Sequence, residues 1–425
     1  MGANQKIQLT FNSKWLLVIS LSVLILLMFF CCFYLFSGYH YLAAWYLKMN
    51  SCFYRQPEWQ GKFFTLQTKK QGNIFCTSGL AVGCILLYQV IKRLKKQVLA
   101  LKLQFNKRDL FMVLAAILTG SIAWIWGYSL VYQGFDEVFS AVNCASLPPF
   151  QTLSYYMLPN NHILFNVLNG VLFSFADDKV FTGKLLSLFC CWGIIIVIFS
   201  WLKGIIKNKV VLLIATIILS LQFPIWGFGF QARGYEFCSL VAWVAFFSLL
   251  RYINTKNSHW LYYYVLASIT GYFCIPVFLY FHAACMLFGL FWVITVNSFD
   301  VKFWKAQAVI IITVFLLYLP ALCFSGLHAL AGNQYVSGQI HNLHDFFHEG
   351  FRSFKGYLSF YTSSFTANHR ADWVLFFVAL YPVRLLQAQT GCLVRFFLSV
   401  HVAGLCCPGL CNGNFPDRPY HERAP

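Results

Sequence analysis

The stretch LFMVLAAILTGSIAWIWGYSLVYQGFDE, residues 110–137, decides the fold class. It contains no charged residue up to Tyr132 and ends in two adjacent carboxylates, Asp136 and Glu137. A transmembrane helix needs roughly 20 apolar residues to cross a hydrocarbon core about 30 Å thick. We therefore predict that residues 110–132 span a membrane and that an acidic pair follows at its surface.

The whole chain has the composition of a membrane protein. Of its 425 residues, 59% are hydrophobic, 19% are aromatic and 10% are charged, whereas about 25% of residues in soluble domains are charged. The apolar runs are continuous and not alternating, which favours helices over a membrane barrel. The fold class that we predict is all-α, a polytopic transmembrane helix bundle. The other predicted spans are residues 15–36, 73–91, 184–202, 210–223, 237–253, 260–275, 276–296, 306–324 and 373–386.

The positive charge of the chain indicates membrane topology and not binding to nucleic acid. The formal net charge is +18, but most Lys and Arg residues lie in short connections between apolar runs, where positive charge marks the cytoplasmic side. The 16 Cys residues are scattered and form no CxxC pair. We interpret them as small buried apolar residues and not as disulfides or metal ligands.

The basic connections predict which loops share a side. The strongest basic block, KRLKKQ at residues 92–97, is placed in the cytoplasm, so residues 110–132 run outward. Lys203, Lys207 and Lys209 mark the next cytoplasmic connection, and residues 184–202 supply the single crossing needed before it. NNHILFNVLNGVLF, residues 160–173, must then not cross. We predict a juxtamembrane amphipathic helix at the outer interface.

This topology places charged residues from separate loops on the external side, where they can converge: Asp136, Glu137, His162, Arg233 and Glu236. A long external segment, residues 325–370, is predicted to cap them. It contains His341, His344, His348, Arg352, Lys355 and His369. The spacing of His341, His344 and His348 admits a zinc site, although no Cys or carboxylate pattern completes one.

Each candidate residue has a functional and a structural interpretation. A carboxylate at a helix exit can be a general base or a metal ligand, or it can simply be solvated. Arg233 offers a planar fork for phosphate oxygens, but it can also extend to lipid headgroups or pair with Glu236. His162 can be a base, a metal ligand or a hydrogen-bonding residue on the polar face that it shares with Asn166 and Asn169.

Three motifs in order carry a family resemblance: FDEVFS at residues 135–140, LPNNHILFNVL at 158–168 and QARGYEF at 231–237. Their order, and their predicted location on one side of the membrane, resemble those of the membrane-embedded GT-C glycosyltransferases. The likeness is to the bacterial members related to protein O-mannosyltransferases and the lipid A aminoarabinose transferase, as in glycosyltransferase family 39. The resemblance covers residues 110–384, with motifs only in the first half. Residues 1–91 add two spans ahead of the usual first helix.

The resemblance implies an enzyme that transfers a sugar from a polyprenyl-phosphate donor to a glycan, lipid or protein acceptor. Asp136 would be the catalytic base, and Glu137 would support it or help to hold an optional divalent metal. The remaining implied roles are a cavity lining by His162 and Asn161, and contacts of Arg233 and Tyr235 with the donor phosphate. The implied location is a bacterial inner membrane, with the site on the periplasmic side.

Two other functions remain open. A transporter or flippase of lipid-linked saccharides would also use external Arg and acidic residues, but should carry charges within its spans, and the predicted spans are nearly free of them. An inactive membrane scaffold is the other alternative.

The predicted domain organisation has three parts. Residues 1–109 form an N-terminal two-helix membrane extension with a basic cytoplasmic loop. Residues 110–386 form the catalytic core, with external loops 133–183 and 325–370. Residues 387–425 form an atypical tail without Lys, which we interpret as a truncation or a reading-frame artefact.

Overall fold

The computed structural model describes residues 7–49, 56–94, 100–130, 134–156, 161–221, 228–296 and 300–331. The chain divides into two compact units, Met1–Gln339 and Ile340–Pro425. The second unit lies outside the described residues. The predicted span 373–386, the tail 387–425 and most of the predicted cap 325–370 therefore lie outside them as well.

The first unit is mainly helical. Its long helices are α1 (Ser13–Phe36), α4 (Leu66–Leu94), α5 (Lys107–Leu130), α9 (Lys179–Leu202), α12 (Tyr235–Thr255), α13 (Ser258–Cys274), α14 (Phe278–Val296) and α15 (Val301–Leu317). The shorter helices are α2 (Tyr39–Lys48), α3 (Gln56–Glu58), α6 (Phe135–Ser140), α7 (Pro149–Ser154), α8 (Ile163–Leu172), α10 (Lys209–Ser220), α16 (Leu319–Phe324) and α17 (Gly326–Ala331). Two π-helical turns, η1 (Trp59–Phe63) and η2 (Ala141–Ala145), complete the helical elements described.

Five helices are long and apolar enough to cross a membrane, judged by length and composition. They are Val18–Phe36, Leu66–Lys92, Lys107–Ser129, Lys179–Leu202 and Tyr235–Thr255, and each contains most of one predicted span. Large apolar side chains cover their outer faces: Phe29, Phe111 and Trp126 are 73%, 70% and 69% exposed. These features are compatible with an integral membrane protein, because in lipid such side chains need no protein cover.

Two predicted spans differ from the helices observed. Residues 210–223 correspond to α10, which has only 12 residues, or about 18 Å of helix. Residues 306–324 are divided between α15 and α16, because Tyr318 ends the first helix and Pro320 opens the second. Proline lacks a backbone N–H and is best tolerated in the first turn of a helix, so a new helix begins there.

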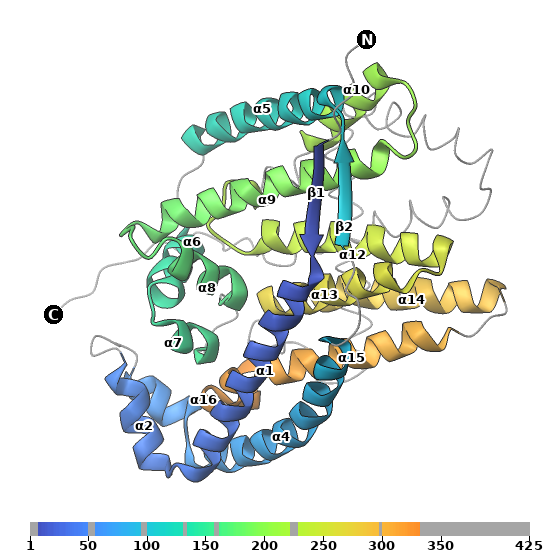
Figure 1. Cartoon of the computed structure of the whole chain (residues 1–425). Helices are drawn as coiled ribbons and strands as arrows, with labels where there is room; N and C mark the ends of the chain where they lie inside the picture. The colour runs from blue at the N-terminus through green and yellow to red at the C-terminus, as the bar shows by residue number, and fades with distance from the viewer. Residues whose placement is uncertain are drawn as a thin grey trace, which may run out of the picture. The chain divides into compact units, whose positions relative to one another are not determined.

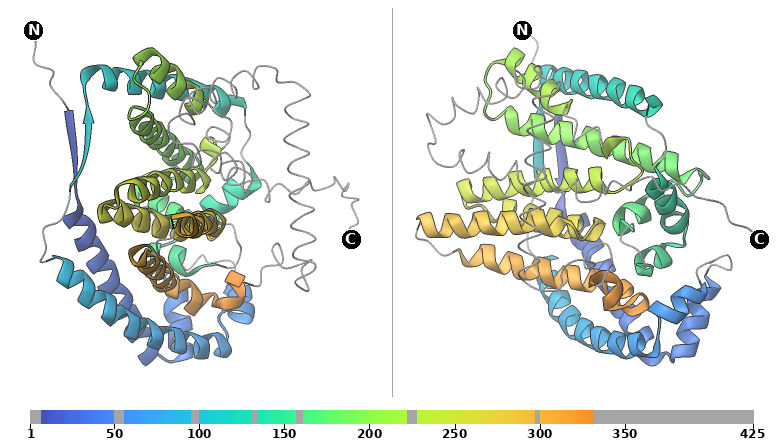
Figure 2. Two further views of the ribbon diagram at one scale, coloured as in Figure 1. Left: turned by 90° about the vertical axis from the view of Figure 1, so that its right-hand side faces the viewer. Right: turned by 180° about the vertical axis from the view of Figure 1, so that it is seen from behind.

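The long helices pack in a continuous row. α9 contacts α5, α10 and α12, then α12 contacts α13, and α13 contacts α15. Figures 1 and 2 show α5, α9, α12, α13, α14 and α15 side by side with nearly parallel axes. The short helices α6, α7 and α8 lie together beside one end of this row, where α8 contacts both α9 and α13.

The basic connections meet at the opposite end of the row, which we call the basic end (Asp109, Lys203, Lys209, Lys256 and Asp300). Lys203 Nζ lies 2.6 Å and Lys209 Nζ 3.6 Å from the Asp109 carboxylate, and Lys256 Nζ lies 3.2 Å from that of Asp300. These contacts join the start of α5 to the end of α9 and the end of α12 to the start of α15. The connections predicted to share one side thus lie together.

The predicted all-α class holds, and one pair of antiparallel strands, β1 (Ile7–Asn12) and β2 (Ala100–Phe105), accompanies the helices. β2 lies within the predicted basic loop. IQLTFN alternates apolar and polar residues throughout, and ALKLQF does so from Leu101 onward, which is the pattern of a strand. In their backbone register Ile7 pairs with Phe105 and Leu9 with Leu103. A search for long apolar runs overlooks such short alternating segments.

The N-terminal helices α1, α2 and α4 join the row through an aromatic cluster. The ring of Tyr46 stacks on Trp59 and on Phe324 of α16, with centroid distances of 4.4 and 4.8 Å. Gln151 of α7 donates to the Tyr46 carbonyl at 2.8 Å. The N-terminal extension therefore also supports the short helices beside the row.

Candidate functional site

Asp136 and Arg233 form an ion pair at the end of the row that carries α6 and α8. Arg233 Nη1 donates to Asp136 Oδ2 at 3.0 Å across 97 positions of sequence. Asp136 lies in the first turn of α6, where the helix dipole favours a carboxylate. The Arg233 side chain is 9% exposed and that of Asp136 is 47% exposed. A buried cation thus faces a carboxylate that solvent can reach.

His162 lies against the same guanidinium from a third segment. It immediately precedes α8, is 1% exposed, and its Nε2 is 3.5 Å from Arg233 Nη2. Its Nδ1 accepts the Gly234 N–H at 2.7 Å, so Nδ1 carries no proton. Burial, together with the Arg233 charge, holds the pKa of His162 well below its ordinary value of 6.5. The ring is therefore neutral, with its proton on Nε2.

Tyr235 completes the surroundings of Arg233. The guanidinium carbon lies 4.7 Å from the centre of the Tyr235 ring, which is a cation–π geometry. The same ring meets His162 edge-on, with a centroid distance of 4.7 Å and an interplanar angle of 79°. The structure thus brings together four of the residues singled out by sequence: Asp136, His162, Arg233 and Tyr235.

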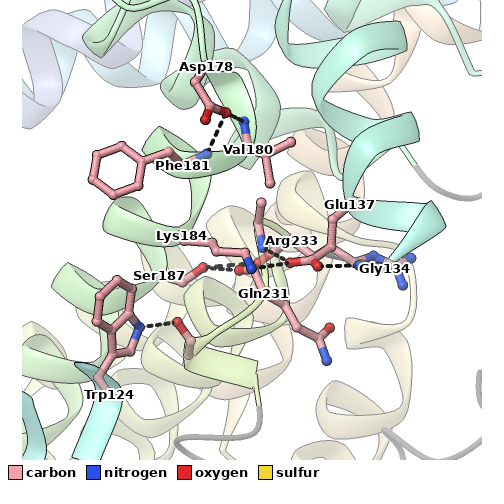
Figure 3. Close-up of polar contacts among 12 residues, drawn as sticks. Trp124, Gly134, Glu137, Asp178, Val180, Phe181, Lys184, Ser187, Gln231 and Arg233 are labelled. Atoms are coloured by element: carbon pink, nitrogen blue, oxygen red, sulfur yellow. Dashed lines mark hydrogen bonds and ion pairs between the residues drawn. The ribbon is translucent and has the colours of Figure 1, made fainter. Parts of the chain in front are cut away.

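Glu137 points away from Asp136 and into the protein. Its Oε2 accepts the Gly134 N–H and its Oε1 accepts the Ala232 N–H, both at 2.7 Å (Figure 3). The residue is 4% exposed. One carboxylate therefore joins the turn that carries Asp136 to the segment that carries Arg233. This geometry gives Glu137 a hydrogen-bonding role that supports the turn of Asp136.

Lys184 is a charged residue that the sequence analysis did not recognise as part of this site. Its Nζ lies 3.9 Å from Glu137 Oε1 and 5.1 Å from the centre of the Tyr128 ring, and the side chain is 2% exposed. The predicted span began at Lys184, but α9 begins at Lys179, which places Lys184 inside the helix. A lysine within a membrane helix marks a buried partner, and this signal was present in the sequence.

The segment before α12 is fixed by further contacts with its backbone. Ser187 of α9 donates to the Gln231 carbonyl at 2.7 Å, and Trp124 of α5 donates to the Gly229 carbonyl at 2.6 Å (Figure 3). Gly234 is closely surrounded, because a Cβ there would lie 2.6 Å from Cys274 Sγ and 2.9 Å from His162 Nδ1. Arg233 is thus attached to a segment held by α5, α6 and α9.

Asn161 does not turn toward Arg233. Its amide nitrogen donates to the carbonyls of Thr152 and Tyr155, at 2.8 and 2.7 Å, and its oxygen accepts from Asn166 at 3.0 Å. Asn166 in turn accepts from Ser140 of α6 at 3.1 Å. The predicted cavity-lining residue instead connects α7, α8 and α6, and so positions the segment that carries His162.

The predicted amphipathic helix is present as α8, but its faces are reversed relative to those of a water-exposed helix. Asn166 and Asn169 are each 1% exposed, whereas Val171 and Leu172 are 51% and 55% exposed. Phe175, just beyond the helix, is 82% exposed. The polar face binds protein and the apolar face is left uncovered, which is the arrangement expected against lipid.

Glu236 is not the partner of Arg233 that the sequence allowed, nor does it lie at the surface. It is fully buried in the first turn of α12, where Cys191 Sγ lies 3.5 Å from its Oε1. Its Oε2 has no hydrogen-bond partner. The start of α12 therefore directs Arg233 and Glu236 to different neighbours.

Metal binding has no candidate within the part of the chain that the structure describes. No group of three or more His, Cys, Asp or Glu side chains there could hold an ion. The histidines at positions 341, 344, 348 and 369, for which zinc was the alternative, lie outside the described residues. The geometry of the candidate site is that of a cation, a neutral imidazole and a carboxylate.

Comparison with family models, curated proteins and solved structures finds no match to this chain.

Proposed function

We propose that this protein is an integral membrane glycosyltransferase of GT-C type, which transfers a sugar from a polyprenyl-phosphate donor to an acceptor at the external membrane face. One observation carries the proposal: Asp136 and Arg233, from distant loops, meet at 3.0 Å at the end of the row opposite the basic end. Sugar transfer from a lipid phosphate needs both a base and a cation.

Asp136 is the proposed base. As the acceptor oxygen forms its bond to the sugar's anomeric carbon, its hydroxyl proton passes to the Asp136 carboxylate. The bond between that carbon and the phosphate oxygen breaks, and its electron pair leaves with the phosphate. The 47% exposure of Asp136 gives an acceptor access to the carboxylate.

Arg233 is the proposed phosphate ligand. A guanidinium presents N–H donors in a fork that matches phosphate oxygens, and its charge stabilises the departing group. The Tyr235 ring at 4.7 Å and the short segment anchored by Glu137 hold it in place before substrate binds. Such preorganisation avoids a cost of reorientation during the reaction.

The surroundings of the site support a lipid-linked donor. Phe135 precedes Asp136 and is 80% exposed, and Phe175 beyond α8 is 82% exposed. A polar site flanked by uncovered apolar side chains fits a substrate with a phosphate head and a polyprenyl chain. The basic end would lie in the cytoplasm, which puts the site on the outer or periplasmic side of a bacterial cell membrane.

One observation favours the transporter or flippase alternative. Lys184 and Glu236 lie inside candidate spans and are buried, and ionisable residues there mark transport pathways in many membrane proteins. Both lie near the ends of α9 and α12 that border Asp136, and Lys184 also pairs with Glu137 of the site described above.

The test uses membranes that contain the full chain and a radiolabelled polyprenyl-phosphate sugar. We expect Asp136→Asn and Arg233→Ala to abolish transfer, while the exposed controls Asp177→Asn and Arg108→Ala retain it. Wild-type rates from either site variant would contradict the catalytic assignment. Movement of the labelled lipid across the bilayer without transfer would support the flippase instead.

A further inference from the structure

We propose that Asp136 occupies, in the ligand-free protein, an anion site formed by Arg233 and His162, and that the donor phosphate displaces it. This inference rests on the proposed function and adds the order of the steps. Binding of the donor phosphate releases the Asp136 carboxylate, which then acts as the base. Until the donor binds, the Asp136 carboxylate would occupy the position of the phosphate.

The hydrogen-bond directions at His162 carry the first step. The Gly234 N–H can only donate, so Nδ1 accepts at 2.7 Å and the ring proton sits on Nε2. Arg233 Nη2, 3.5 Å from this Nε2, is also a donor and has no acceptor capacity. Neither atom can accept from the other. Both N–H groups can therefore converge on one acceptor, such as a phosphate oxygen.

The charge of the surroundings favours an anion at this position. Arg233 is 7% exposed, and a buried cation needs a counter-charge. His162 adds a donor without adding charge. Gly234 is the N-cap of α12, a helix of 21 residues, whose amino end contributes partial positive charge. Asp136 supplies the counter-charge in the structure.

Replacement of the Asp136 carboxylate by phosphate is favoured by how firmly Arg233 and Asp136 are each held. Arg233 is held by its stacking on Tyr235 and by the Glu137 contact to the neighbouring Ala232 N–H. Asp136 lies on α6, a helix of six residues, with nearly half its side chain exposed. The carboxylate is therefore the partner that can leave, and a phosphate has enough oxygens to accept from both Arg233 and His162.

The exchange links the two substrates. While Oδ2 accepts from Arg233 at 3.0 Å, that oxygen is not available to an acceptor hydroxyl. Once phosphate takes the guanidinium, Oδ2 is released beside the reacting centre. We infer that the donor binds first and completes the site for the acceptor.

The experiment measures binding of a polyprenyl monophosphate, which carries no sugar to transfer, to the purified full chain in detergent. Removing the competing charge with Asp136→Asn should tighten binding about tenfold, whereas His162→Asn should weaken it about tenfold. The asparagine oxygen can still accept the Gly234 N–H, so this variant removes the Nε2 donor while keeping the structural contact. Unchanged or weaker binding by Asp136→Asn would overturn the inference.

A second measurement uses the wild-type protein and does not depend on any variant folding. Carbodiimide-driven coupling of an amine to Asp136, followed by mass spectrometry, should rise when the lipid phosphate is added, while coupling at the exposed Asp177 should not. No rise at Asp136 would overturn the inference. Competition by inorganic phosphate, with none by polyprenol, would show that the phosphate group is recognised.

The outcomes separate this inference from the proposed function. Wild-type protein that fails to bind the lipid phosphate would contradict both. Binding without tightening in Asp136→Asn, or without the rise in coupling, would reject only the exchange. Stronger recognition of free phosphate than of the lipid phosphate would point to a soluble ligand and would contradict the proposed donor.

Discussion

The carboxylate of Glu137 accepts the backbone N–H of Ala232 at 2.7 Å, and thereby fixes the residue next to Arg233 from the residue next to Asp136. The adjacent acids in the sequence thus have different positions in the structure. Asp136 faces the guanidinium and solvent, while Glu137 is buried and holds the two loops together. The first can act on a substrate, and the second positions it.

Glu137→Gln should destabilise the protein. Glutamine can accept only one of the two backbone N–H groups at its amide oxygen, so its amide nitrogen would face the other donor. We expect a loss of about 1–3 kcal/mol, measured as a lower thermal unfolding temperature in detergent. Asp136→Asn, the matched variant one residue away, should lose less stability, because the Asp136 side chain is 47% exposed and the asparagine oxygen can still accept from Arg233. Equal unfolding temperatures for both variants would contradict the positioning role.

Lys184→Met should also lower stability, by about 1–3 kcal/mol, because the buried Glu137 charge loses its cation at 3.9 Å. The effects of the two substitutions should not add. A protein that carries both Lys184→Met and Glu137→Gln should lose less stability than the sum of the single variants, since neither buried charge is left alone. Strict additivity of the unfolding temperatures would show that the residues act independently.

His162 should make stability depend on pH. Burial, with the Arg233 charge, holds its folded pKa well below 6.5, so the unfolded chain takes up a proton below pH 6.5 that the folded ring does not. Stability is complete above pH 6.5 and falls as the pH is lowered, by up to about 1.4 kcal/mol per pH unit. The wild-type protein should lose this stability between pH 6.5 and 5 relative to His162→Asn. If the stabilities of the wild-type protein and His162→Asn changed equally with pH, the His162 ring could not be neutral in the folded protein.

Gly234→Ala should disturb the site through a steric contact. The added methyl group would lie 2.6 Å from Cys274 Sγ and 2.9 Å from His162 Nδ1, closer than side chains pack. We expect a loss of roughly 1–3 kcal/mol and weaker binding of the lipid phosphate. Gly61→Ala is the control, because nothing lies within 4 Å of its added Cβ. Cys274→Ala in the same chain should restore part of the loss.

The sequence predicted the long helices well, because a run of apolar residues is a direct requirement of the bilayer. It also grouped the basic connections that lie together at one end of the row. It did not predict which member of the acidic pair turns inward, since both positions have the same local chemistry. That choice is made by Ala232 and Lys184, which are distant in sequence. Lys184 was overlooked because α9 begins earlier than the hydropathy pattern indicates, and Glu236 was expected at the surface because α12 also begins earlier, at Tyr235.

Labelling from outside the cell tests the sidedness on which the proposed function depends. Asp177 is exposed just before α9, and Lys107 is exposed at the start of α5, near the basic end. A membrane-impermeant maleimide should therefore label Asp177→Cys in intact cells and should label Lys107→Cys only after the membrane is opened. The wild-type chain provides the background from its native cysteines. The reverse pattern would place Asp136 and Arg233 in the cytoplasm, where an external acceptor could not reach them.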